Sequence, residues 1–324
     1  MGVPMNFRRK WAAALAAALA GALALTACGS DIESSSSSAS QAPCGTVNIA
    51  VNPWVGYEAD AAVVAHVLET KLGCTVELKN LTEEVSWQGF ASGTIDVILE
   101  NWGHDDLKQK YIEQQNVAVE VGQTGNKGII GWYVPPWLAE EYPDITEYKN
   151  LNKYAAQFKT TESGGKGQLL DGDPSYVTND EALVKNLDLN FKVVYAGSEN
   201  ALIEAFRTAE EQRKFLIGYF YEPQWFLSEI PLVHVSLPAY SEGCDADPAA
   251  VACDYAPYDL DKIARKAFME SGSPAVTVIK NFSWTNDDQN AVAKDIADKM
   301  SYDDAAKKWV DAHPDQVAAW LATS

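Results

Sequence analysis

The chain has 324 residues, 47% of them hydrophobic, and a formal net charge of −20. This length predicts one large domain or two ordinary ones, with enough apolar residues for a core. The acidic residues are spread along the chain rather than gathered in blocks, which argues against nucleic acid or an anionic membrane surface as a partner.

The N-terminus has the pattern of a bacterial lipoprotein signal. A basic cluster at positions 8–10 precedes Trp11–Leu25, an apolar stretch of 15 residues that is too short for a comfortable transmembrane helix. Leu25-Thr26-Ala27-Cys28 is similar to a lipobox, which predicts a signal peptide over residues 1–27 and lipidation of Cys28. An ordinary secretory signal is the alternative. Residues 28–43 are rich in Ser and Ala and are expected to form a flexible tether. The predicted location is the extracytoplasmic face of the bacterial plasma membrane, held by the lipid anchor.

Four cysteines remain apart from the one in the lipobox, and export permits disulfides between them. Three pairings are possible. Cys44 and Cys74 each stand just before a strand-like run, so they would meet if the two strands are parallel neighbours. Cys244 and Cys253 would then close a short loop. Metal binding is the alternative, but no CxxC or histidine spacing supports it.

The next part of the chain alternates between predicted strands and helices. In order, these are a strand at Val47–Val51, a helix at Glu58–Leu72, a strand at Thr75–Leu81, a helix at Thr82–Gly93 with a capping signal at Thr82, and a strand at Asp96–Leu99. This order implies a parallel sheet with crossover helices. Ligands of such sheets bind beyond the carboxyl ends of the strands, where Trp54 and Trp102 both stand. His104 follows in the same loop as Trp102 and is a further candidate ligand-binding residue.

A second region of α/β pattern follows the strand predicted at Lys127–Val134, which ends in two prolines. Its predicted elements are a helix-and-turn region at Leu138–Lys153, a Gly- and Asp-rich segment at Thr160–Tyr176, a helix at Asn179–Asn186 capped by Asn179 or Thr178, a strand at Phe191–Tyr195, an amphipathic helix at Ser198–Arg213 and a strand at Leu232–Leu237. The chain is expected to cross back near residues 256–260. Helices are then predicted at Leu260–Glu270, Asn286–Met300, Tyr302–Ala312 and Pro314–Leu321, packing on the first region.

Gly218–Phe226 contains five aromatic residues among nine, which is more than a surface loop or an aliphatic strand would contain. We interpret Tyr221 and its neighbours as part of an aromatic box for a small organic cation; the alternative is that the rings fill the core. A quaternary ammonium group has no N–H to donate, so a protein holds it by π faces, shape and nearby negative charge. A carboxylate elsewhere on the ligand would need N–H donors, which Trp54, Val55 and Gly56 could supply where the loop opens into a helix.

Motifs for catalysis are absent from the sequence. It has only four histidines and no HExxH, GxSxG, P-loop or GxGxxG motif. Asp171-Gly172-Asp173 begins like a calcium loop, but Tyr176 stands where the EF-hand glycine is needed. No metal or cofactor is therefore expected. An extracytoplasmic enzyme with Glu100, Asp105 or Glu222 as acid or base is the alternative, because paired carboxylates leave little trace in a sequence.

Four motifs carry a family resemblance. They are Ala91-Ser92-Gly93-x-x-Asp96 leading to Asn101-Trp102; Gly172-Asp173-Pro174-Ser175-Tyr176; Tyr221-Glu222-Pro223-Gln224-Trp225; and Trp309–Trp320. In these motifs the sequence resembles the glycine betaine/proline betaine substrate-binding proteins of ABC transporters, over about residues 46–321.

The resemblance implies a binding site for a trimethylammonium group. Its three-ring cage falls on Trp102, Tyr176 and Tyr221, of which the last two are tryptophan in familiar members. Glu222 stands where a small polar residue is common, and Gln224 stands where some members have histidine. An acid beside the cage would strengthen cation binding or favour a cation without a carboxylate, such as choline.

The resemblance also implies the architecture and the partners. The family fold is α/β with two lobes, a type II-like periplasmic-binding-protein fold with a hinge of two crossing strands, which places lobe 1 at residues 44–130 plus 259–324 and lobe 2 at 131–258. Hinge closure would bury an osmolyte and present a surface to an ABC permease with its cytoplasmic ATPase. The alternatives are a choline- or carnitine-type binding protein of the same fold, or an extracytoplasmic sensor.

Overall fold

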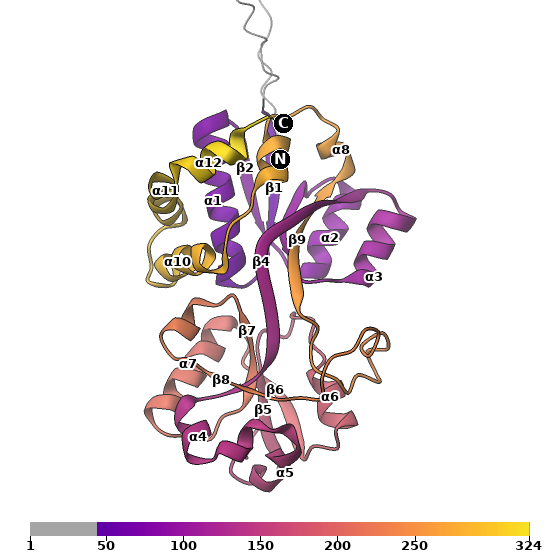
Figure 1. The fold of residues 1–324 in the computed structure, drawn as a ribbon. Coiled ribbons are helices and arrows are strands. Elements are labelled where there is room, and N and C mark those ends of the chain that lie inside the picture. Colours follow the sequence, from indigo (N-terminus) through magenta and orange to yellow (C-terminus); the bar gives the residue numbers. More distant parts are fainter. Residues whose placement is uncertain (1–43, 324) are drawn as a thin grey trace, which may run out of the picture. The chain divides into compact units, whose positions relative to one another are not determined.

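The computed structural model describes residues 44–323, so the predicted signal peptide at 1–27, the lipidation site Cys28 and the tether at 28–43 lie outside the described residues. Residues 44–323 form an α/β fold with two lobes, which confirms the predicted fold class (Figure 1). Hydrogen-bonded strands run in the order β2-β1-β3-β9-β4-β7-β5-β6, and β8 pairs with β4.

The first lobe is built on three parallel strands. These are β1 (Thr46–Val51), β2 (Thr75–Asn80) and β3 (Val97–Asn101). Its main helices are α1 (Val55–Leu72), α2 (Glu83–Ser92), α3 (Asp105–Lys108), α9 (Ala275–Asn281), α10 (Asn286–Ala297), α11 (Tyr302–Ala312) and α12 (Pro314–Leu321). α1 packs against the sheet on one side and against α9, α10 and α11 on the other, so it is buried nearly all round up to Leu68.

The second lobe has a smaller sheet and shorter helices. Its strands are β5 (Gly167–Asp171), β6 (Phe191–Tyr195), β7 (Gly218–Glu222) and β8 (Val233–Val235). Its helices are α4 (Pro136–Glu141), α5 (Leu151–Tyr154), α6 (Asp180–Asn186) and α7 (Glu199–Glu211). α7 buries Leu202, Ile203 and Phe206, as its periodicity predicts, and Ser198 caps it by accepting a hydrogen bond from the Ala201 N–H.

Two strands connect the lobes. β4 (Ala118–Val134) has 17 residues and pairs antiparallel with β9 (Tyr258–Arg265) at one end and with β7 and β8 at the other. β4 therefore runs from one lobe into the other, as Figure 1 shows. The predicted lobe limits at residues 130 and 259 fall within these two strands, and we keep them as a proposal.

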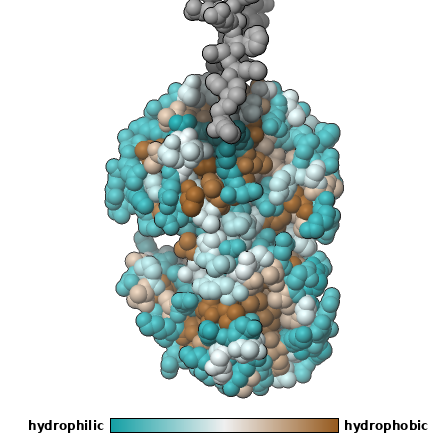
Figure 2. All heavy atoms as spheres, turned by 180° about the vertical axis from the view of Figure 1, so that it is seen from behind, coloured by the Kyte–Doolittle hydropathy of each residue, from teal (hydrophilic) through white to brown (hydrophobic). Residues whose placement is uncertain are grey.

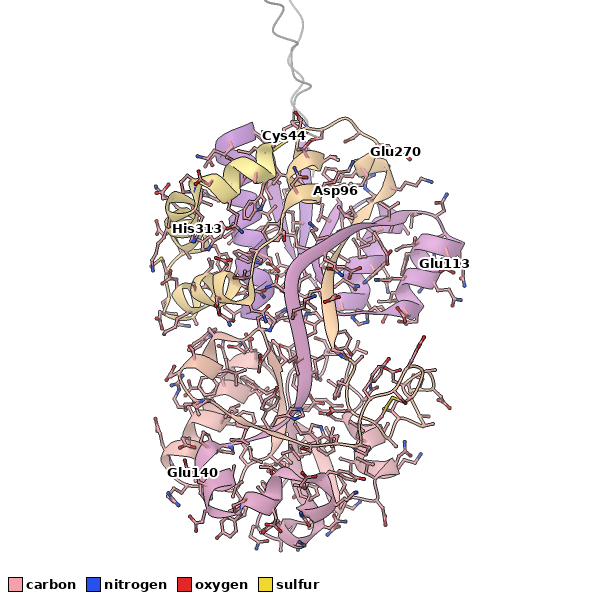
Figure 3. All side chains as sticks on the ribbon, in the orientation of Figure 1. Cys44, Asp96, Glu113, Glu140, Glu270 and His313 are labelled. Carbon is pink, nitrogen blue, oxygen red and sulfur yellow. A yellow bond between two sulfur atoms is a disulfide. The ribbon has the colours of Figure 1, made fainter. Side chains whose placement is uncertain are left out.

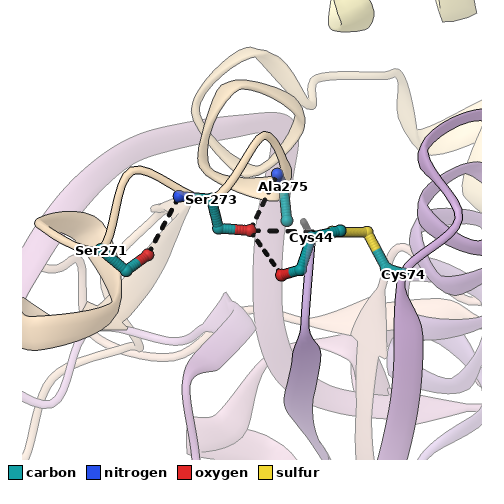
Figure 4. Close-up of a disulfide and its surroundings, with 5 residues drawn as sticks. All are labelled: Cys44, Cys74, Ser271, Ser273 and Ala275. Atoms are coloured by element: carbon teal, nitrogen blue, oxygen red, sulfur yellow. Dashed lines mark hydrogen bonds between the residues drawn. A yellow bond between two sulfur atoms is a disulfide. The ribbon is translucent and has the colours of Figure 1, made fainter. Parts of the chain in front are cut away.

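Two disulfides are present among the described residues. Cys44 is bonded to Cys74 with 4.9 Å between the Cα atoms, and Cys244 is bonded to Cys253 with 6.3 Å. β1 and β2 are parallel with Thr46 opposite Thr75, so the residues before the two strands lie side by side. Ser273 donates a hydrogen bond to the Cys44 carbonyl at 2.9 Å and thereby ties the start of β1 to the segment before α9 (Figure 4).

The structure corrects several predicted elements. The helix predicted at Leu260–Glu270 is wrong: residues 258–265 form β9, and only Lys266–Met269 (α8) is helical. Lys262 is buried in β9 and its ammonium donates to the Lys280 carbonyl at 3.1 Å, so a charged residue at an inward position hides the strand pattern. β4 begins at Ala118, before its predicted start, and β5 and α9 were not predicted.

The predicted helix caps at Thr82 and Asn179 are confirmed in position only. Both residues stand at N-cap positions, but neither side chain makes a capping hydrogen bond. The Thr82 carbonyl instead accepts from the Ser86 N–H and from the Ser86 hydroxyl, each at 2.9 Å, so the first turn of α2 is closed without the Thr82 side chain.

Some motif residues serve the fold. Asp96, labelled in Figure 3, lies in the first lobe, where it accepts from the Asn48 N–H at 2.9 Å and from Arg265 Nε at 3.0 Å, which joins three parts of the sheet. Trp309 and Trp320 stack with ring centroids 5.4 Å apart and an interplanar angle of 8°. These residues hold the scaffold on which the site is built.

One face of the molecule is mainly hydrophilic (Figure 2). Hydrophilic residues cover most of the face in Figure 2, and the hydrophobic areas form separate patches on it. Glu113, Glu140 and Glu270 are exposed on three separate segments (Figure 3). Among residues 44–323, no helix combines the length and the apolar character needed to cross a membrane.

Candidate ligand-binding site

A cavity of about 670 Å³ is lined by residues of both lobes. Its aromatic lining residues are Trp54, Trp102, Tyr176, Tyr219, Tyr221, Tyr240, Tyr255 and Tyr258. Its acidic lining residues are Glu83, Asp105, Asp106, Glu242 and Asp245. Of the described residues that line it, none is lysine or arginine. The cavity therefore offers π faces and negative charge, which suits a cation.

Six of these rings form a continuous series of contacts. The ring centroids are 5.7 Å apart for Trp54 and Tyr176, 6.1 Å for Tyr176 and Tyr219, 5.9 Å for Tyr219 and Tyr221, 5.8 Å for Tyr221 and Trp102, and 5.7 Å for Trp102 and Tyr258. The series passes from the first lobe to the second and back. The three predicted cage residues all belong to it.

The alternation of β7 decides which rings reach the cavity. Tyr219 and Tyr221 are two residues apart, so they share one face and line the cavity. Phe220 lies on the other face and packs on Phe206 with ring centroids 5.4 Å apart. Glu222 shares that alternation, is only partly buried and does not line the cavity. Glu222 was expected beside the cage, but the alternation of the strand places it on the opposite face from Tyr221.

Tyr176 is held in the second lobe and reaches the first. A Cβ on Gly172 would lie 2.7 Å from the Tyr176 ring, so the ring sits directly on the glycine. Its hydroxyl donates to the Pro53 carbonyl at 2.9 Å. This hydrogen bond crosses from one lobe to the other beside the cavity.

Glu100 orients the two tryptophans of the first lobe. Its Oε1 accepts from Trp54 Nε1 at 2.8 Å and from Trp102 Nε1 at 2.7 Å, and its Oε2 accepts from Gln289 Nε2 at 2.8 Å. Burial raises the pKa of Glu100, although the indole hydrogen bonds favour its charged form. The carboxyl at the end of β3 thus fixes both rings through one oxygen atom.

A second buried carboxyl, Glu199, lies at the junction of the lobes. Glu199 Oε2 accepts from the Val55 N–H at 2.9 Å, and Oε1 accepts from Gln224 Nε2 at 2.5 Å and from the Tyr221 hydroxyl. Burial raises the pKa of Glu199 to about 7, although these hydrogen bonds favour its charged form. Glu199 was not singled out in the sequence, because an acid after a serine at a helix start is an ordinary pattern.

His104 lines the cavity and is paired with Glu83. Its Nε2 lies 2.8 Å from Glu83 Oε1. Burial alone would lower the pKa of His104, but the hydrogen bond and charge of Glu83 outweigh it, so the pKa is raised. Within residues 44–323 no group of three or more His, Cys, Asp or Glu side chains is arranged to hold a metal ion.

The remaining predicted site residues do not line the cavity. Val55 and Gln224 both donate to Glu199, and Gly56 is buried against Gln289. Among the residues that sequence reasoning missed are the cavity-lining Tyr219 and Tyr258, and Glu199. Strand alternation from Tyr221 was the signal that could have found Tyr219.

Comparison with known proteins identifies a family to which the sequence is similar. Residues 45–312 match the model of the family described as the substrate binding domain of ABC-type glycine betaine transport system. The chain is 24% identical over 285 residues to the trimethylamine N-oxide-binding protein of Pelagibacter ubique, with 81% of this chain and 86% of the relative covered.

Two solved structures show the same fold. The closed, liganded conformation of lactococcal OpuAC with glycine betaine matches with a TM-score of 0.68 and 22% identity, covering 86% of this chain and 100% of that one. An ABC-transporter choline binding protein in complex with choline matches with a TM-score of 0.69 and 19% identity, covering 86% of this chain and 92% of that one.

Proposed function

The chain belongs to the family of substrate-binding domains of ABC-type glycine betaine transport systems, and on that premise we propose that it captures a quaternary-ammonium solute in its aromatic cage. In this proposal the cage consists of Trp102, Tyr176 and Tyr221. The family is one of transporter substrate-binding proteins and not of enzymes, so the ligand is bound and released unchanged.

The observation that carries the proposal is the ring series around an acidic cavity whose lining, within residues 44–323, includes no lysine or arginine. Each π face contributes about 0.5–2 kcal/mol to holding a cation, so several faces are needed for useful affinity. The relative described above is a trimethylamine N-oxide-binding protein, and the two solved structures are complexes with glycine betaine and choline; all three ligands have a methylated nitrogen. Their shared chemistry supports a methylated nitrogen as the group that this cage holds.

The proposal extends to delivery. Substrate-binding proteins of ABC importers work outside the cytoplasm, and the chain would pass its solute to a permease driven by a cytoplasmic ATPase. Lipidation of Cys28 would keep it at the membrane surface, with residues 28–43 as the tether. Hinge motion about β4 and β9 would open and close the cavity.

Replacing Trp102 by alanine tests the cage. The Trp102→Ala variant loses one π face and its contact with Tyr221, so we expect choline and glycine betaine to bind at least about tenfold more weakly. Isothermal titration calorimetry measures both affinities. Tyr195→Ala is the control, because Tyr195 is an exposed ring on β6 outside the cavity. Unchanged affinity in Trp102→Ala for every ligand that the wild type binds would refute the cage.

A further inference from the structure

The first N–H donor of α1, that of Val55, is occupied by the protein's own carboxylate. Val55 is the first residue of α1, a helix of 18 residues, and its N–H points at Glu199 Oε2 from 2.9 Å away. Gln224 and Tyr221 donate to the other oxygen of the same carboxyl. All three contacts are donations to Glu199, which matches a carboxylate that only accepts.

Two helix N-termini meet at this carboxyl. Glu199 is the first residue of α7, and its side chain reaches the first turn of α1, 144 residues away in sequence. Each N-terminus carries a partial positive charge that favours an anion. Glu199 is 6% exposed, and Tyr221, to which it is bonded, lines the cavity. The start of α1 would suit the carboxylate of a zwitterionic ligand, but the Glu199 side chain already occupies it.

We propose that Glu199 is a specificity-determining residue that makes the site accept methylated ammonium cations with a neutral remainder and reject those with a carboxylate. The inference rests on the proposed function of the cavity. It names the class of ligand: a trimethylammonium group with a hydroxyl or another uncharged hydrogen-bonding group, as in choline.

Charge explains the preference. A ligand carboxylate that approached the start of α1 would meet the Glu199 carboxylate and would find the Val55 N–H and Gln224 amide already engaged. Displacing Glu199 would leave a buried carboxylate without its three donors, which is strongly unfavourable. A ligand with only a positive charge meets neither cost, and it is attracted by Glu199 and by the acidic lining residues Glu83 and Asp105.

Choline and glycine betaine make a matched pair for the test, because both have a trimethylammonium group on a two-carbon chain and they differ in hydroxyl against carboxylate. Calorimetry on the purified full chain at pH 8, above the pKa of about 7 of Glu199, measures both affinities, with tetramethylammonium as the cation alone. We expect choline to bind at least about tenfold more tightly than glycine betaine. In Glu199→Gln, which keeps the size of the side chain and removes its charge, this ratio should fall severalfold.

Glu204→Gln is the matched control, since Glu204 is an exposed acid on the same helix and its loss should leave the ratio unchanged. Glycine betaine binding to the wild type as tightly as choline would overturn the inference without any variant, so it stays testable if Glu199→Gln does not fold. A folded Glu199→Gln variant with an unchanged ratio would also overturn it. If none of the three ligands binds the wild type, the proposed function fails as well, and the two failures are thus distinguishable.

Discussion

Asp180 is a buried carboxyl beside the cavity wall whose protonation is coupled to folding. Its Oδ1 accepts from Trp132 Nε1 at 2.8 Å and from the Tyr255 hydroxyl at 2.7 Å, while Oδ2 has no hydrogen-bond partner among the described residues. Burial and the nearby Asp171 carboxylate raise the pKa of Asp180 from 3.8 to about 8. The folded protein therefore prefers the neutral acid.

The sign of the resulting pH dependence follows from the two pKa values. The folded value of about 8 lies above the ordinary 3.8, so folding takes up a proton between these limits and is opposed increasingly as the pH rises through this window. Asp180→Asn keeps the acceptor for Trp132 and removes the charge. We expect its stability relative to wild type to rise between pH 5 and pH 8, by on the order of 1–3 kcal/mol.

Urea unfolding at pH 5, 6.5 and 8 measures this difference. Glu181→Gln removes the neighbouring exposed carboxyl and provides the control. A constant difference between Asp180→Asn and wild type across this range would show that Asp180 does not change its protonation on folding.

For single residues, the sequence predicts which side chains could bind a ligand better than it predicts which residues they contact in the fold. Trp102 and Tyr221 could be proposed from aromatic density and from motifs, because rings next to turn residues are unusual. Glu199 could not, since its role depends on Val55, which lies 144 residues away and in the other lobe. Glu222 was favoured by its nearness to Tyr221 in sequence, although neighbours along a strand point to opposite faces.

Among the elements, β4 supports the cage residue Trp102, whose ring packs against Gly128 of this strand. A Cβ on Gly128 would lie 2.6 Å from Trp102 Cζ3 and 3.1 Å from Leu260 Cδ2, so the indole rests directly on the strand backbone. Gly128 and Leu260 are buried, and Trp102 is partly buried. The position of the Trp102 ring thus depends on a strand that carries no cage residue itself.

Gly128→Ala should push the Trp102 ring away from its position. We expect a lower melting temperature from overpacking and ligand affinity weakened by about 3- to 30-fold. Gly167→Ala on β5 is the matched control: its Cβ would meet the Phe191 ring at 2.7 Å, in the core of the second lobe. It should lower the melting temperature without weakening binding. Thermal unfolding and calorimetry of both variants distinguish the effects; full affinity in a destabilised Gly128→Ala would contradict the argument.

Helices and strands were predicted correctly where the local pattern of apolar residues was clear. β1, β2 and α11 were located because apolar residues recur with one clear period and turn residues bound them. β9 was assigned as helix because the buried Lys262 breaks its alternation, and its hydrogen bond to a backbone carbonyl is a tertiary contact. β5 was missed because glycines and acids surround a short run of buried residues.

For the molecule as a whole, the lobes are joined beside the cavity by two hydrogen bonds as well as by β4 and β9. Glu199 binds the Val55 N–H, and the Tyr176 hydroxyl binds the Pro53 carbonyl at 2.9 Å. Both connect the loop at the start of α1 to the second lobe. They are made only when the lobes approach, so they stabilise the closed arrangement over an open one.

Tyr176→Phe separates the closing contact from the cage. The variant keeps the π face of the ring and loses only the hydroxyl, so the cation is held as before but the closed state is less stable. A hydrogen bond contributes about 0.5–1.5 kcal/mol net, which predicts binding weakened by about 2- to 10-fold. The loss should come from faster ligand dissociation, because the lobes reopen more readily. Stopped-flow fluorescence measures the dissociation rate, and small-angle X-ray scattering measures the unliganded radius of gyration, which should increase.

Tyr154→Phe is the matched control for Tyr176→Phe. It also removes a tyrosine hydroxyl, which is hydrogen-bonded to Asp144 at 2.5 Å, but it does so on the surface of the second lobe and away from the cavity. It should change neither the dissociation rate nor the scattering. If Tyr176→Phe matched this control in both measurements, the Tyr176 hydroxyl would have no part in closure, and the ring alone would account for its place in the site. Faster dissociation with an increased radius, in Tyr176→Phe only, would show that the hydrogen bond from the Tyr176 hydroxyl to the Pro53 carbonyl holds the two lobes together around the cavity.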